Sequence, residues 1–156
     1  MKRDSKLSLA LHALGHLALA PDSALPSEDL ARIGPTNPVV VRRVLGLLRD
    51  AGLVTSAKGH AGGWRLAKTP AQITVADVYR ALGEGLDPAP GAGPHNPTTC
   101  AIERALHGHW DAAIALAQSA LLDRLSKVSI ADLSGSMADA QVHAHEHGSP
   151  ARPPVL

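Results

Sequence analysis

Apolar residues at helical spacing dominate the start of the chain. Four leucines lie three or four residues apart and predict a helix over roughly residues 5–19. They are Leu7, Leu11, Leu14 and Leu17. After the turn APDSALPS, we expect Ser27 to cap a short second helix, SEDLARIG, which ends at Gly34. The pattern therefore predicts two helices joined by a turn.

The stretch PTNPVVVRRVLGLLRDAG predicts a third helix that is apolar on one side and basic on the other. Asn37 is placed to cap it, and Pro38 falls at the first helical position, where its missing N–H removes no hydrogen bond. The apolar face consists of Val41, Val44, Leu45 and Leu48. The residues away from that face include Arg42, Arg43 and Arg49. Two short helices joined by a tight turn, with the second basic on its outer side, are typical of a helix-turn-helix.

The hydrophobic period changes after Gly52. Leu53–Thr55 and Trp64–Leu66 are expected strands, and the glycine-rich segment SAKGHAGG lies between them. This pattern predicts a β-hairpin with a basic tip, and a hairpin directly after a helix-turn-helix is a wing. We expect Trp64 and Leu66 to hold the wing against the core rather than to stack on bases.

The second half of the chain predicts two further helical regions. TVADVYRALGEG has capping-box spacing at Thr74 and Asp77, and a loop rich in Pro and Gly follows it. A long helix starts at Thr98 or Thr99, and LDRLSKVSIADL either continues it or forms a second short helix. Its apolar stripe begins at Ile102 and is longer than a small winged helix needs for its own core, which favours a homodimer interface. We assign that interface to Leu106, Trp110, Ala113, Ala117 and Leu121.

These elements predict a mainly α fold with a small β-hairpin wing, that is, a winged helix-turn-helix plus a long C-terminal dimerisation helix. We expect a DNA-binding domain at residues 1–85, a loop at 86–97 and a dimerisation helix region at 98–133. Residues 134–156 are expected to form a disordered, His-containing tail.

Charge is distributed unevenly along a chain whose formal net charge is only +1. Residues 1–70 hold ten Lys and Arg against five Asp and Glu, a balance of +5, and residues 71–156 hold five against nine, a balance of −4. A basic front half indicates a polyanion partner. No apolar run is long enough to span a membrane, and His12 and His16 interrupt the one that looks like a signal peptide. With a single Cys, the chain is expected to be cytoplasmic and without a membrane partner.

The segment from Asn37 to Gly85 resembles the Rrf-two (Rrf2) family of bacterial winged-helix transcriptional regulators. The matching residues are RRVLGLLRDAGLVTSAKGHAGGWRLAKTPAQITVADVYRALGEG, of which the wing and the following P..IT..DV are the most specific part. The first helix and the long helix also fit, so the resemblance covers roughly residues 4–133. It implies a homodimer that binds a pseudo-palindromic operator in double-stranded DNA, usually as a repressor.

A recognition helix in the major groove brings the residues near its N-terminus to bases or phosphates. In this chain those residues are Thr36, Asn37, Val39, Val40, Arg42 and Arg43. Lys58 and His60 of the wing are expected to meet phosphates or the minor groove. The wing glycines, which let the backbone approach the duplex, are Gly59, Gly62 and Gly63. The alternatives are that the arginines only solvate their helix and that the hairpin is an ordinary loose one.

Cys100 is the only cysteine, and three histidines lie near it in PHNPTTCAIERALHGHW. Cluster-binding members of the family carry three cysteines before the dimer helix, in a sensor loop that corresponds to residues 86–97 here. Cys100 matches only the last of the three, so we expect no cofactor and disfavour an iron–sulfur cluster. Three interpretations stay open: a redox- or electrophile-sensing thiol, an atypical Cys/His site for a metal or cluster, and a buried small apolar residue. The sensing thiol is our leading hypothesis, because a helix N-terminus favours the thiolate.

The chain lacks a nucleophile–base set, a phosphate loop and an HExxH motif, so we do not expect an enzyme. The leading hypothesis is a dimeric, sequence-specific DNA-binding transcriptional regulator, a repressor whose operator binding responds to chemistry at Cys100. The first alternative is an iron–sulfur or metal-responsive regulator with atypical Cys/His ligation. The second is a winged-helix module that binds a partner protein and has no sensor.

Overall fold

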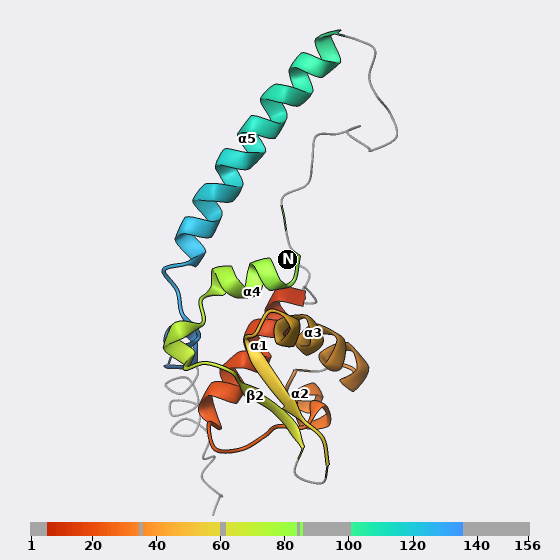
Figure 1. Cartoon of the computed structure of the whole chain (residues 1–156), viewed down its shortest axis with the longest axis vertical. Coiled ribbons are helices and arrows are strands. Elements are labelled where there is room, and N and C mark those ends of the chain that lie inside the picture. The colour runs from red at the N-terminus through yellow and green to blue at the C-terminus, as the bar shows by residue number, and fades with distance from the viewer. Residues whose placement is uncertain (1–5, 35, 60–61, 84, 86–100, 136–156) are drawn as a thin grey trace, which may run out of the picture.

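The structure is a computed structural model that describes residues 6–34, 36–59, 62–83, 85 and 101–135 (Figure 1). Its helices are α1 (Lys6–Leu19), α2 (Ser27–Ile33), α3 (Pro38–Asp50), α4 (Val75–Ala81) and α5 (Ala101–Leu125). The other elements are the strands β1 (Val54–Ala57) and β2 (Gly63–Leu66) and a 3₁₀ turn, η1 (Pro70–Gln72). The expected mainly α fold with a two-stranded hairpin is therefore confirmed. The expected tail lies outside the described residues beyond position 135, and Ser134 and Gly135 are still helical.

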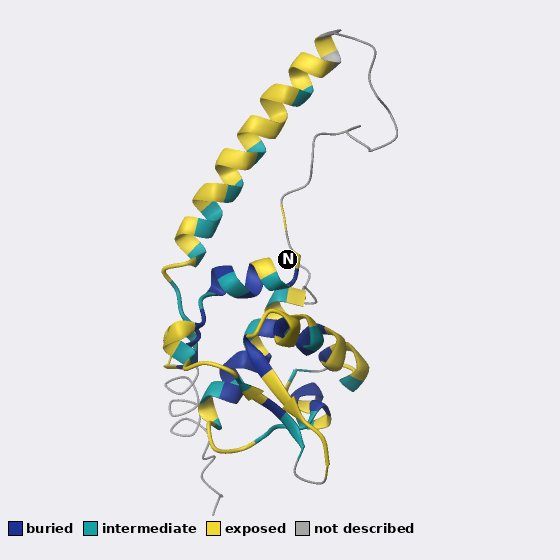
Figure 2. Ribbon diagram, in the orientation of Figure 1, coloured by how far each residue is buried: buried dark blue, intermediate teal, exposed yellow. Residues whose placement is uncertain are grey.

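The core lies where α1, α3, α4 and the hairpin meet, as the dark residues in Figure 2 show. The apolar face predicted for α3 is buried in the core along its whole length. Its four residues are Val41, Val44, Leu45 and Leu48. They pack in one cluster with Leu14 and Leu17 of α1 and Val78 of α4. Burying a Leu or Val side chain contributes about 1.5–3 kcal/mol, so this cluster fixes which side of α3 faces outward.

Local capping signals set the helix ends at two of the three predicted positions. The Asn37 side chain accepts a hydrogen bond from the Val39 backbone N–H at 2.8 Å, and Thr74 and Asp77 form a reciprocal capping box at the start of α4. The prediction for Ser27 is wrong. Pro26 occupies the cap position, and Ser27 is a buried residue inside α2 whose hydroxyl accepts a hydrogen bond from Trp64 Nε1 at 2.9 Å. The buried indole N–H needs an acceptor, and Ser27 supplies it.

The hairpin is antiparallel, with a register that runs from Val54 opposite Leu66 to Ala57 opposite Gly63. Its first strand starts one residue later than expected, because Leu53 closes the turn after α3 by donating its N–H to the Leu48 carbonyl at 2.9 Å. A short bridge between Leu25 and Trp64 adds a third extended segment beside β2.

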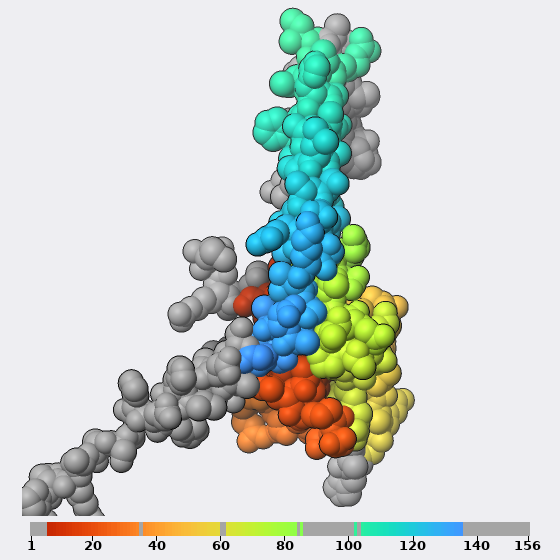
Figure 3. Space-filling model, turned by 90° about the vertical axis from the view of Figure 1, so that its left-hand side faces the viewer, coloured from red at the N-terminus to blue at the C-terminus, as the bar shows by residue number. Residues whose placement is uncertain are grey.

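The helix α5 stands away from the rest of the fold (Figures 1 and 3). It ends at Leu125, a turn follows, and the next helical segment begins at Ile130, so LDRLSKVSIADL does not continue α5 as one helix. Backbone hydrogen bonds of 2.9 Å join Val75 N–H to the Val128 carbonyl and Ile130 N–H to the Ile73 carbonyl, and Ile130 is fully buried. The C-terminal end of α5 is thereby anchored to the core. No helix within the described ranges is long and apolar enough to cross a membrane.

Candidate nucleic-acid interface

The N-terminal half of α3 presents a mixed apolar and basic surface. Val39 and Val40 are 63% and 45% exposed, although both are β-branched apolar residues. Arg42 and Arg43 are exposed beside them, as are Thr36 and Asn37 ahead of the helix. Because Val41 and Val44 point into the core, the intervening residues face away from it. The α3 residues assigned to DNA contact, Val39, Val40, Arg42 and Arg43, thus share the side of the helix that faces away from the core.

The arginines of α3 have different surroundings. Arg42 Nη2 donates to Glu28 Oε1 of α2 at 2.7 Å, whereas Arg49 pairs with the adjacent Asp50 at 2.9 Å. Arg43 is exposed and has no ion-pair partner among the residues that the structure describes. Arg42 is therefore bound to the neighbouring helix, whereas Arg43 is exposed without an acidic partner among the described residues.

Glu28 is the residue of this surface that sequence reasoning missed. Its backbone hydrogen bond at the start of α2 and the hydrogen bond from Arg42 lower the pKa of its carboxyl group. Both contacts favour the charged form of this carboxyl group. Its partner lies 14 residues further along the chain, so local sequence spacing does not indicate this contact.

The backbone of the wing tip itself requires glycines. A Cβ on Gly62 would lie 2.5 Å from the Ala57 carbonyl oxygen, and a Cβ on Gly63 would lie 2.8 Å from the Leu25 backbone. Gly59 has φ +106°, a conformation that residues with a side chain rarely adopt. These glycines are needed to form the hairpin itself, whatever approaches it. Lys58 is exposed, and His60 lies outside the described residues.

Trp64 holds the wing to the helix-turn-helix, as predicted. It is buried, its indole N–H is bonded to Ser27, and its backbone pairs with Leu25. Leu66 is partly buried against the same core. Arg65 adds a hydrogen bond from Nη1 to the Asp22 carbonyl oxygen at 3.0 Å. The wing is therefore fixed relative to α2 and α3.

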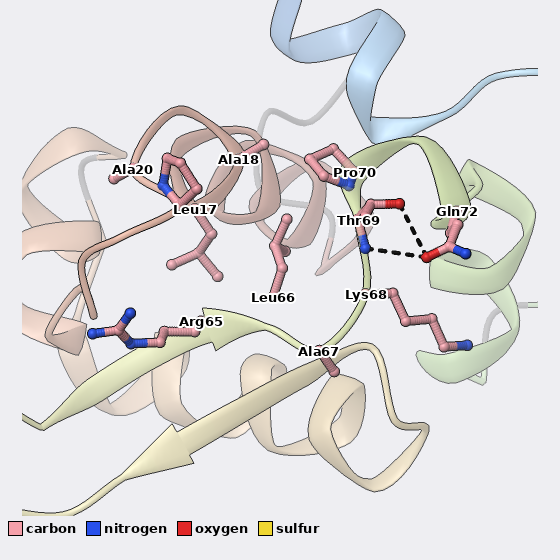
Figure 4. Close-up of a pocket in the computed structure, with 11 residues that line it drawn as sticks. Leu17, Ala18, Ala20, Arg65, Leu66, Ala67, Lys68, Thr69, Pro70 and Gln72 are labelled. Carbon is pink, nitrogen blue, oxygen red and sulfur yellow. Dashed lines mark hydrogen bonds between the residues drawn. The ribbon is translucent and has the colours of Figure 1, made fainter.

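A cavity of about 450 Å³ lies between the end of α1 and the segment from β2 to η1 (Figure 4). Leu17 and Leu66 point into the space between these elements, and Thr69 and Gln72 are hydrogen bonded to each other at its edge. Its lining includes Arg65 and Lys68 but no carboxylate, imidazole or thiol. The cavity thus contains no side chains suited to binding a transition metal.

The predicted dimer stripe on α5 is exposed along the outer part of the helix. Ile102, Leu106 and Trp110 are 79%, 59% and 41% exposed. Ala113 and Ala117 are exposed as well, and Leu121 is half-buried near the anchored end. A surface with this composition is left uncovered by the chain's own fold.

The residues considered for sensing are only partly within the described structure. Cys100 and His95 lie outside the described residues, whereas His107 and His109 lie on α5. Among the residues that are described, no group of three His, Cys, Asp or Glu could hold a metal ion. His12 and His16 of α1 have ring centroids 4.8 Å apart, and partial burial together with the charge of His12 lowers the pKa of His16.

Comparisons with known proteins agree with this geometry. The family model described as "Rrf2: Iron-dependent Transcriptional regulator" matches residues 3–136. YwnA of Bacillus subtilis, named as a candidate HTH-type transcriptional regulator, is 32% identical over 130 residues, which are 83% of this chain and 95% of YwnA. The structure of IscR from T. potens gives a TM-score of 0.63 at 22% identity and covers 90% of this chain and 91% of that chain. CymR, the global cysteine regulator of B. subtilis, gives 0.62 at 23% identity, with 87% and 98% covered.

Iron, which the family description names, needs a set of thiolate, imidazole or carboxylate ligands. The part of the chain that the structure describes supplies no such set, and the chain's one cysteine lies outside it. The described residues therefore do not fit an iron or iron–sulfur site.

Proposed function

Because the chain belongs to the Rrf2 family of HTH transcriptional regulators, we propose that it is a homodimer that binds a pseudo-palindromic DNA operator and represses transcription. A regulator of this family is not an enzyme, and DNA is its partner. The observation that best supports operator binding concerns the outward face of α3. There Val39, Val40, Arg42 and Arg43 are exposed beside a basic wing.

This face has the chemistry that reads a major groove. An α-helix fits the groove, arginines bind guanine edges or phosphates, and apolar side chains contact thymine methyl groups. The anchored wing holds Lys58 at a fixed place relative to α3, where it reaches the sugar–phosphate backbone. Base contacts from α3 supply the sequence preference, and the basic side chains supply the affinity.

The exposed side of α5 supports the dimer. Monomeric proteins rarely leave an extended apolar surface in water, and Ile102, Leu106 and Trp110 form one along a single helix. The core already anchors the opposite end of α5 through Val128 and Ile130, so a second copy packs against the free part without disturbing the fold. A two-fold dimer presents two α3 helices to successive turns of DNA.

A gel-shift titration of the DNA upstream of the chain's own gene tests this function. We expect binding that weakens steeply with salt, and a loss of about 1–3 kcal/mol of binding free energy for Arg42→Ala. Lys58→Ala is expected to reduce the salt slope by about one. Arg124→Ala, an equal charge change at an exposed site on α5, serves as the control and leaves binding unchanged. If Arg42→Ala and Lys58→Ala both bind like the wild type, the groove model is wrong and a protein partner becomes the better explanation.

We further propose that Cys100 tunes operator binding as a redox-sensing thiol. Its position directly before α5 supports this, since α5 begins at Ala101 and a helix N-terminus stabilises a thiolate. The thiolate attacks one oxygen of a peroxide and becomes a sulfenic acid, while the other oxygen leaves as hydroxide. Operator affinity of the wild type is expected to change after peroxide treatment, and that of Cys100→Ser is not. Equal responses of the two proteins would rule out the thiol switch.

A further inference from the structure

The ion pair between Glu28 and Arg42 links the two helices of the helix-turn-helix at their outer surface. The Arg42 Nη2 to Glu28 Oε1 distance is 2.7 Å, and the two side chains are 54% and 59% exposed. An exposed pair of this kind typically contributes only about 0–1 kcal/mol to folding stability. Folding stability therefore does not explain why an acidic residue lies at the edge of a surface that is proposed to bind a polyanion.

The neighbouring charges show that this arrangement is particular to Glu28. Asp29, the next residue, pairs with Arg32 within α2 and does not reach α3. Arg43, beside Arg42, has no acidic partner in the described part of the chain. Of the two acids in the first turn of α2, only Glu28 bonds to the recognition helix.

The geometry leaves Arg42 partly occupied but still able to bind DNA. A guanidinium group carries five N–H donors in one plane, and the hydrogen bond to Glu28 uses a donor on Nη2. Holding that nitrogen restricts the rotation of a long, flexible side chain, so less conformational entropy is lost when the remaining donors bind. Arg42 is thereby oriented before DNA arrives.

We propose that Glu28 is a positioning residue that gives Arg42 its base selectivity, an inference that rests on the proposed DNA-binding function. At a matched site, Arg42 keeps Glu28 and directs its free donors to the acceptors on a guanine edge. At an unmatched site, Arg42 reaches a phosphate only by leaving Glu28, and the carboxylate then stays unpaired beside the polyanion. Glu28 therefore weakens non-specific binding more than specific binding.

The test compares two duplexes and two matched variants. The specific duplex is one that the wild-type protein enriches from a random-sequence pool, and the non-specific duplex has the same base composition in scrambled order. Glu28→Ala is compared with Asp29→Ala, which removes the same charge from the adjacent position of the same helix turn. The measured quantity is the ratio of the two affinities at one salt concentration.

We expect Glu28→Ala to lower this ratio by at least about fivefold, the lower end of what one bidentate arginine–base contact discriminates. Asp29→Ala is expected to raise both affinities alike and leave the ratio unchanged. In an Arg42→Ala background, Glu28→Ala is expected to have no further effect on the ratio, because Glu28 acts through Arg42.

Two results overturn the positioning role while leaving the DNA-binding function intact. One is an unchanged ratio in Glu28→Ala, which would reduce Glu28 to a general negative charge. The other is an equal loss of selectivity with and without Arg42. A wild-type protein that enriches no duplex at all would instead overturn the proposed function and this inference with it.

Discussion

The hydrogen bond from Trp64 Nε1 to Ser27 Oγ joins the wing to the helix-turn-helix. Replacing Ser27 by Ala tests how much this hydrogen bond contributes to the free energy of unfolding. Both residues are buried, with 8% and 5% exposure, and the donor–acceptor distance is 2.9 Å. Ser27→Ala removes the acceptor and adds no bulk. The indole N–H is then left in the interior without a partner.

The expected loss of stability follows from the burial of both residues. Leaving a buried donor unsatisfied costs about 1–3 kcal/mol, whereas removing both partners together is nearly neutral. We therefore expect Ser27→Ala to lower the free energy of unfolding by about 1–3 kcal/mol in the wild-type background. In a Trp64→Phe background, which already lacks the donor, we expect the same substitution to cost less than about 0.5 kcal/mol.

Urea unfolding followed by far-ultraviolet circular dichroism measures these costs without relying on the fluorescence of Trp64. All four proteins of the cycle are compared at one protein concentration, since the apparent stability of the proposed dimer would depend on concentration. The midpoint is expected to fall while the slope m stays constant. A cost below about 0.5 kcal/mol for Ser27→Ala, or an equal cost in both backgrounds, would refute the reasoning.

Three further changes test other parts of the structure. Burial opposes ionisation of Asp77, but hydrogen bonds from Thr74 outweigh it and lower the pKa of the carboxyl group below its ordinary value of 3.8. The ionised Asp77 therefore stabilises the fold fully above pH 3.8, and this stabilisation is lost as the pH falls through the folded-state pKa. Asp77→Asn should accordingly lower the melting temperature more at about pH 7 than at about pH 2.5. Gly63→Ala is expected to lower the melting temperature by the equivalent of more than about 1 kcal/mol, because φ is +156° and the new Cβ meets backbone at 2.8 Å; an unchanged melting temperature would contradict this. Replacing thymine by deoxyuridine in a bound duplex removes only a methyl group, and we expect it to weaken binding of the wild type but not of the Val39→Ala/Val40→Ala double variant; equal losses would show that these valines do not contact thymine methyls.

Structural features that depend on residues close together in the sequence could be predicted from it. The Asn37 cap and the capping box of Thr74 and Asp77 each depend on residues within three positions of one another, and both are formed as predicted. The buried face of α3 was equally clear, because hydrophobic period alone determines it.

Contacts between residues far apart in the sequence could not be predicted in this way. Ser27 looked like a helix cap because serine favours that role, but a tryptophan 37 residues away uses its hydroxyl instead. Glu28 lies in the first turn of α2, and its local sequence does not indicate the hydrogen bond to Arg42, 14 residues away. Ile130 follows a long helix without any sign in the sequence that the chain returns there to the core. Each depends on tertiary packing, which helical periodicity does not encode.

We propose that two copies of this chain read DNA through paired α3 helices. The sequence motif enriched by the full-length protein from a random DNA pool tests that claim most directly. We expect an inverted repeat whose half-site centres lie about one helical turn, roughly 10 base pairs, apart. Enrichment of a single unrepeated element, or of no sequence at all, would contradict it.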